Sequence, residues 1–128
     1  MNILDENIIS WQSQLLRDMK IRYRQIGVGF GRKGMNDRHQ IIPLLHSLRR
    51  PTFFTRDVDF FKTDLLHAGH CLVFLDIPAG ETAEYIRRFL RHSAFRTQAQ
   101  RMGKVVRVRP TGLSWWEIDD KSEHALSW

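Results

Sequence analysis

The sequence predicts an α/β fold with a mainly parallel central sheet, because short apolar runs alternate with amphipathic stretches of helical length. The run CLVFLDI at residues 71–77 is apolar almost throughout, which is typical of a parallel strand buried on both faces. After residue 104 the period changes to two residues in KVVRVRPTGLSWWEI, where Pro110, Thr111 and Gly112 supply a turn. We therefore expect an α/β sandwich that ends in a C-terminal β-hairpin.

Four short apolar runs are predicted to form the parallel part of the sheet. They are NIL at 2–4, QIGVGFG at 25–31, TFFT at 52–55 and the run at 71–77. The second of these strands leads into a glycine-rich loop.

Helices are predicted between and after these strands, at 7–19, 37–48, 60–69 and 80–92. The first has apolar residues at helical spacing, namely Ile8, Trp11, Leu15 and Met19. The second begins at Asp37, a residue type that caps helices, and contains Pro43, so a kink or a late start is expected there.

A chain of 128 residues is expected to form one domain, with a core at about 1–93 and a hairpin extension at about 94–128. Apolar residues make up 42% and charged residues 27%, the composition of an ordinary globular protein. No apolar run approaches the roughly 18 residues of a membrane helix, and the N-terminus does not resemble a secretory signal. The single cysteine, Cys71, excludes a disulfide framework and a cysteine zinc site. We expect a cytoplasmic protein without membrane contact.

The formal net charge of +6 favours a polyanionic partner. Between Arg87 and Arg109 there are eight Lys or Arg residues and no Asp or Glu. A solvated basic face explains most runs of this kind, but the asymmetry still favours a partner.

Carboxylates follow two of the predicted strands. Asp5 and Glu6 follow the first strand, and Asp57 and Asp59 follow the third. Asp37 begins the helix after the second strand. Because ligands bind outside the carboxyl ends of parallel strands, we expect these acids at one edge of the sheet, where a cation would offset their repulsion. Oxygen ligands of this kind suit Mg²⁺.

Each acid also has a simpler explanation. Asp5 and Asp37 are suitable helix caps, and Asp57 and Asp59 are suitable turn residues. Taken singly, the cap or turn is the better explanation; taken together at one predicted edge, a shared metal is the better one.

Two motifs resemble the PIN-like nuclease superfamily. ILDEN at 3–7 and FTRDVDF at 54–60 are similar to the LLDEN and TRDxDF motifs of a small branch related to the VapC-type toxin ribonucleases. The resemblance covers roughly residues 1–77. It implies a PIN-like three-layer α/β/α sandwich and a Mg²⁺- or Mn²⁺-dependent endoribonuclease, often paired with an antitoxin protein and often homodimeric.

The resemblance assigns catalytic roles by position to Asp5, Asp37, Asp57 and Asp59. It places the metal on Asp5, Asp57 and Asp59, with Glu6 beside them, and places a hydroxyl at Thr55. Two departures are Pro43, inside the helix that Asp37 begins, and the tail from about residue 94, which lies beyond the matched region.

Several further residues are candidates for RNA contacts: Arg32, Lys33, Arg56, Arg87, Arg88 and Arg91. Solvated surface arginine is an equally good explanation of the last three. Trp115 and Trp116 alternate along a strand, so one should face inward and the other outward, with a core or dimer role favoured over base stacking. The six histidines show no ligand motif and are expected at the surface or at caps.

Two other functions remain open. A phospho-receiver-like signalling domain would use Asp76 as acceptor, the Asp5–Glu6 pair and Lys104, but it leaves Asp57 and Asp59 without a task. A non-catalytic PIN-like module would bind RNA through the basic face alone.

Overall fold

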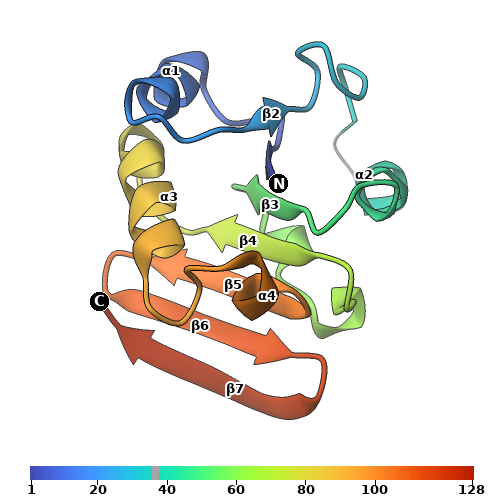
Figure 1. The fold of residues 1–128 in the computed structure, drawn as a ribbon, viewed down its shortest axis with the longest axis vertical. Helices are drawn as coiled ribbons and strands as arrows, with labels where there is room; N and C mark the ends of the chain where they lie inside the picture. The colour runs from blue at the N-terminus through green and yellow to red at the C-terminus, as the bar shows by residue number, and fades with distance from the viewer. Residues whose placement is uncertain (36–37) are drawn as a thin grey trace.

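One mixed sheet of seven strands runs through the protein in the order β2-β1-β3-β4-β5-β6-β7 (Figure 1). The structure is a computed structural model that describes residues 1–35 and 38–128. The strands are β1 (Asn2–Leu4), β2 (Arg24–Gln25), β3 (Thr52–Thr55), β4 (Cys71–Leu75), β5 (Lys104–Arg109), β6 (Gly112–Glu117) and β7 (Asp120–Ser127). Neighbours from β2 to β5 pair in parallel, and β6 and β7 continue the sheet antiparallel. The predicted α/β class is confirmed.

Helices pack on both faces of the sheet. Helix α1 (Ser10–Asp18) and helix α3 (Thr82–Arg91) contact each other and cover one face, and helix α2 (Arg38–His46) covers the other (Figure 1). Adjacent residues of each parallel strand enter opposite cores: Phe54 lies in the core under α1 and α3, and Phe53 in the core under α2. This is why these strands are apolar throughout.

Two predicted elements are wrong. The strand expected at 25–31 ends at Gln25, because four glycines with positive φ turn the chain into a loop at positions 27, 29, 31 and 34. The helix expected at 60–69 is replaced by two 3₁₀ turns, Val58–Phe60 and Thr63–Leu65. The Asp57 side chain caps the first of these turns, which places Phe60 in the core under α2.

The other predicted helices are present with shifted ends. Helix α2 runs through Pro43 and begins no later than Arg38 among the described residues. Helix α3 begins at Thr82 after a 3₁₀ turn, Ala79–Glu81, and buries Ala83, Ile86 and Phe89. A short helix that was not predicted, α4 (Gln98–Arg101), begins with a capping box formed by Thr97 and Gln100.

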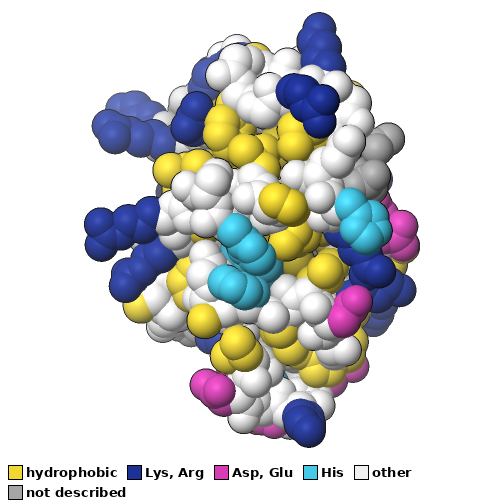
Figure 2. All heavy atoms as spheres, turned by 90° about the vertical axis from the view of Figure 1, so that its right-hand side faces the viewer, with side chains coloured by type: hydrophobic (Ala, Val, Ile, Leu, Met, Phe, Trp, Pro, Cys, Tyr) yellow, Lys and Arg dark blue, Asp and Glu magenta, His cyan; other side chains and the backbone are white. Residues whose placement is uncertain are grey.

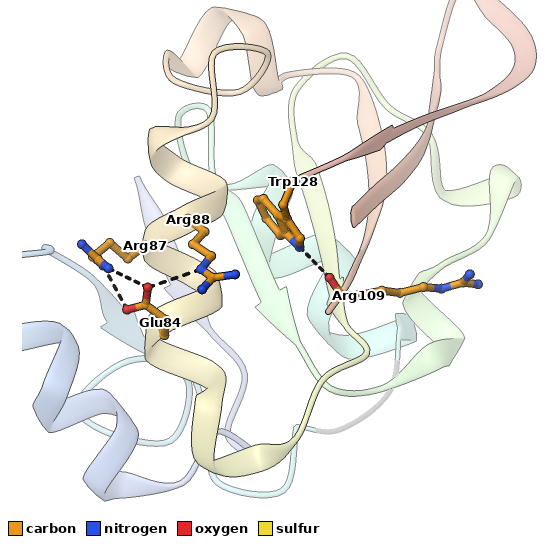
Figure 3. Close-up of polar contacts among 5 residues, drawn as sticks. All are labelled: Glu84, Arg87, Arg88, Arg109 and Trp128. Carbon is orange, nitrogen blue, oxygen red and sulfur yellow. Dashed lines mark hydrogen bonds and ion pairs between the residues drawn. The ribbon is translucent and has the colours of Figure 1, made fainter. Parts of the chain in front are cut away.

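The C-terminal hairpin is confirmed, and a further strand follows it. Strands β5 and β6 meet across Pro110 and Thr111, while β7 adds a third, mostly polar strand at the sheet's outer edge. Strand β5 also pairs in parallel with β4 from Cys71 to Leu75, so residues after 94 lie within the same sheet as the first half. Trp128 at the end of β7 donates a 2.7 Å hydrogen bond from its indole Nε1 to the carbonyl oxygen of Arg109 (Figure 3).

The tryptophan pair points to the two faces of the sheet, as predicted. Trp115 is buried in the core under α1 and α3. Trp116 lies on the other face, where its ring centroid is 4.7 Å from that of Phe61. Both rings therefore pack within this chain.

Candidate functional site

The carboxyl ends of β1 and β3 form the point where the strand order reverses. From β1 the chain crosses to β2 on one side, and from β2 it crosses back to β3 on the other side of β1. The connections that follow β1 and β3 leave these strand ends in opposite directions. Open α/β sheets bind their ligands at such a point. Asp5 follows β1 directly, and Asp57 follows β3 by two residues.

A threonine hydroxyl joins these two acidic segments. The Thr55 hydroxyl donates to Asp5 Oδ2 over 2.6 Å and accepts a hydrogen bond from the Asp57 backbone N–H over 3.0 Å. The other Asp5 oxygen accepts from the Glu6 backbone N–H over 2.7 Å. Asp5, 4% exposed, is thus held in one orientation by groups from both strands.

Burial raises the pKa of Asp5 above its ordinary value. The hydrogen bonds from Thr55 and Glu6 partly oppose this effect, whereas the nearby carboxylates of Asp57 and Glu6 add to it. A negative charge on Asp5 is therefore unfavourable in this position unless a cation lies beside it.

The other predicted acids lie at different distances from this pair. The Glu6 carboxylate turns toward the glycine-rich loop, where both of its oxygens lie 3.0 Å from the Gly34 backbone nitrogen. Asp59 is exposed, and its backbone N–H donates to Asp57 Oδ1 over 2.9 Å. Asp37 lies outside the described residues. Within 1–35 and 38–128, these acids do not form a set of three ligand atoms within 4.8 Å of one another.

Gly27 allows the Glu6 carboxylate to approach the loop. Its φ is +86°, and a Cβ added there would collide with Glu6 Oε2. Gly29 also has a positive φ, +65°, but a Cβ there would meet nothing within 4 Å. We expect Gly27→Ala to lower the free energy of unfolding by about 1 kcal/mol more than Gly29→Ala, because only the first displaces Glu6 from Gly34. Urea unfolding of both variants measures the difference, and equal losses would contradict the assigned contact.

The predicted RNA-contacting residues occupy two regions. Arg56 bridges the ends of β3 and β4 by donating from Nη1 to the Ile77 carbonyl over 2.9 Å, and the side chains of Arg32 and Lys33 are exposed in the glycine-rich loop. Figure 3 shows Arg87 and Arg88 on α3, both directed at Glu84. This ion-paired cluster holds two of the predicted contacts on one helix face, and Arg91 is exposed at the end of the same helix.

A basic groove that the sequence pattern did not indicate lies beside β2. It has a volume of about 650 Å³, and its basic lining consists of Arg17, Lys20, Arg22 and Arg24. The Arg24 guanidinium lies 4.1 Å from the ring centroid of Phe30, which also lines the groove. These four charges, spread over residues 17–24, converge only because the chain turns from α1 into β2.

The residues of the receiver alternative do not meet. Asp76 follows β4, where its Oδ2 lies 2.6 Å from Arg107 Nη2. Lys104 pairs in register with Cys71 at the opposite end of that strand. Since a strand rises about 3.3 Å per residue, Lys104 cannot reach Asp76 in this fold.

Comparison of the chain with family models, with curated proteins and with solved structures finds no match.

Among the described residues, no helix has both the length and the apolar character needed to cross a membrane.

Proposed function

We propose that the protein is a metal-dependent endoribonuclease of PIN-like type, with its reaction centre at Asp5 and Asp57. The observation that carries this proposal is the Asp5–Thr55–Asp57 arrangement at the point where the strand order reverses. One hydroxyl contacts both the Asp5 carboxylate and the Asp57 backbone N–H, so it joins the two segments that carry these acids, which are 52 residues apart in the sequence. Burial of an aspartate beside a second acid is unfavourable unless something offsets the charges, and a bound cation would do so.

The chemistry of the donors fits Mg²⁺ or Mn²⁺. Asp5 and Asp57 supply oxygen ligands, and hard divalent cations accept a few carboxylates and complete their shell with water. The raised pKa of Asp5 supports the fit, since a cation would offset both burial and the neighbouring charges. When bound, the ion would supply Lewis-acid chemistry to a phosphodiester.

Residues of the chain position both the metal-binding carboxylates and the RNA substrate. Thr55 fixes the Asp5 carboxylate, and the cap that Asp57 forms on Asp59 fixes the turn that carries the second acid. Arg32 and Lys33 are exposed in the glycine-rich loop whose Gly34 N–H contacts Glu6, so an RNA backbone bound along this loop would pass near the acidic edge. The basic groove beside β2 adjoins the same loop at Gly29 and Phe30. The biological role that we propose is the toxin of a type II toxin–antitoxin pair, acting as a homodimer in the cytoplasm and inhibited by an antitoxin protein.

Cleavage of single-stranded RNA in Mn²⁺ tests this function. Asp57→Asn should lower the rate by at least about 100-fold, because even partners that only orient metal ligands are worth 10–100-fold. Asparagine retains the capping oxygen, so the turn should persist. Asp119→Asn, an exposed carboxylate in the β6–β7 turn, is the matched control and should leave the rate unchanged.

Cleavage that survives both EDTA and Asp57→Asn would exclude the proposal. Salt-sensitive RNA retention without cleavage would favour the binding module, and labelling by acetyl phosphate that is lost in Asp76→Asn would favour the receiver. Growth arrest on expression, relieved by Asp57→Asn but not by Asp119→Asn, would support the toxin role.

A further inference from the structure

Three histidines from two segments meet on the face covered by α2. His46 is the last residue of α2, and His67 and His70 lie in the segment before β4. One ring nitrogen from each of the three lies within 4.8 Å of the other two. Figure 2 shows histidine side chains gathered on this face among hydrophobic side chains. The sequence spacing led us to expect surface or capping histidines, and this is wrong for His70, which is 1% exposed.

The buried ring of His70 has one nitrogen without a partner. Its Nε2 lies 2.8 Å from the carbonyl oxygen of Leu65, which can only accept, so Nε2 carries the proton. Nδ1 therefore presents a lone pair, and it is buried without a hydrogen-bond partner among the described residues. A backbone carbonyl on the opposite nitrogen is the usual support of a metal-ligating histidine. Burial also lowers the pKa of His70 to about 4, so its ring is neutral at neutral pH.

The other two rings are exposed and free to adjust. His46 and His67 are stacked with their centroids 4.1 Å apart, and His67 Nδ1 accepts a hydrogen bond from the Gly69 N–H over 2.9 Å. Tetrahedral zinc with Zn–N bonds of about 2.0–2.1 Å places its ligand nitrogens about 3.4 Å apart. Small rotations of the two exposed rings, with release of the Gly69 bond or a change of tautomer, would bring the nitrogens to that spacing.

We propose that His46, His67 and His70 form a binding site for Zn²⁺ or a similar divalent transition metal. Imidazole nitrogen suits zinc, copper, nickel and cobalt, whereas Mg²⁺ requires oxygen ligands. Three protein nitrogens leave a fourth position for water or another ligand. His46 also lies at the carboxyl end of α2, where the helix dipole favours a cation. Cys71, although next to His70 in sequence, is fully buried and faces the other core.

This site is separate from the acidic edge. His70 directly precedes β4 and so lies at the amino end of the parallel strands, whereas Asp5 and Asp57 lie at their carboxyl ends. The proposal therefore does not depend on the nuclease function. A metal bound here would fasten the end of α2 to the segment before β4, two elements that the chain connects only through β3.

Titration of the chelator-treated protein with Zn²⁺ tests the site. We expect one equivalent to bind and to raise the melting temperature, and Co²⁺ to give the visible absorption of a nitrogen-ligated ion. His46→Gln and His67→Gln remove exposed ligands without disturbing the core, and each should weaken Zn²⁺ binding by at least about 100-fold. His39→Gln is the control, because His39 is exposed on the same helix but outside the group, and it should bind like the wild type.

Three results would overturn the proposal: no Zn²⁺ binding by the wild type, equal binding by the wild type and both glutamine variants, or loss of the site in Asp57→Asn instead. The last would place the metal at the acidic edge. Retention of the site in Asp57→Asn, together with its loss in His46→Gln and His67→Gln, would support it whatever the outcome of the RNA assay.

Discussion

Replacement of Asp5 by asparagine is expected to stabilise the fold and to abolish RNA cleavage at the same time. Asparagine keeps an oxygen for the Glu6 N–H, and its amide can donate to the Thr55 oxygen, so the hydrogen-bonded frame keeps both contacts, the second with its direction reversed. The substitution removes a buried negative charge that Asp57 and Glu6 make less favourable. In EDTA at pH 7, we expect the free energy of unfolding to rise, because the neutral asparagine avoids the unfavourable burial of a charge.

The pH dependence of this gain has a definite sign. Because the pKa of Asp5 is raised by folding, the folded chain binds the proton more tightly than the unfolded chain. The loss of stability caused by the buried Asp5 charge is complete above the folded-state pKa. It disappears as the pH falls toward the unfolded-state pKa of about 3.9. The stability difference between Asp5→Asn and the wild type should therefore be largest at pH 7 and should narrow toward pH 4.

Urea unfolding at several pH values measures this difference, with Asp119→Asn as the control for loss of an exposed carboxylate. Mn²⁺ should stabilise the wild type and should have a smaller effect on Asp5→Asn, since a ligand that binds only the folded state adds its binding free energy. Cleavage should fall by at least about 100-fold. A less stable Asp5→Asn at pH 7 would show that the frame requires the charge, contrary to our account of the site.

Replacement of Arg101 by alanine should cause the largest loss of stability that we predict. Arg101 is 6% exposed and donates to the Thr52 hydroxyl over 3.0 Å and to the carbonyl oxygens of Phe95 and Arg96 over 2.8 and 3.2 Å. Alanine would leave these buried acceptors without their donor. Since each unsatisfied buried group costs about 1–3 kcal/mol, we expect a total loss of about 3 kcal/mol.

Burial of the charge of Arg101 destabilises the fold and so offsets part of the stability that its hydrogen bonds contribute. Burial lowers the pKa of its guanidinium, and among the described residues no carboxylate forms a salt bridge with it. Arg101→Met, which fills a similar volume without charge, should therefore cost less than Arg101→Ala. Arg96→Ala, at an exposed position nearby, should change the free energy of unfolding by less than about 0.5 kcal/mol. A loss below 1 kcal/mol for Arg101→Ala would contradict this role.

The parts of the fold that could be predicted are those with a strong apolar pattern. TFFT forms β3 at the predicted residues, and the hairpin of β5 and β6 turns within the predicted Pro110-Thr111-Gly112, of which Gly112 is already the first residue of β6. Strand β7 was missed because it is an edge strand with mostly polar and exposed residues, so its sequence has little apolar alternation. The strand expected at 25–31 failed for the opposite reason: its apolar residues are interrupted by glycines whose positive φ no strand can contain.

The site was predictable where it follows from topology. Asp5 and Asp57 come together because the carboxyl ends of parallel neighbours meet at one edge. The positions of Glu6 and Asp59 depend on individual loop contacts, with Gly34 and with the Asp57 cap, which residue spacing does not encode. The histidine group had no sequence signal, since His46 comes from a different segment than His67 and His70.

The pairing register of strand β3 is fixed by polar contacts at its two ends. Both faces of β3 are apolar, with Phe53 in one core and Phe54 in the other. It therefore lacks the difference between a buried and a solvent-exposed face that normally prevents a shift of register by one residue. Its terminal hydroxyls supply the missing specificity, because Thr52 meets the Arg101 guanidinium and Thr55 meets the Asp5 carboxylate only in the observed alignment. Asp5, to which we assign a catalytic role, therefore also fixes the register of the neighbouring strand β3, together with Arg101.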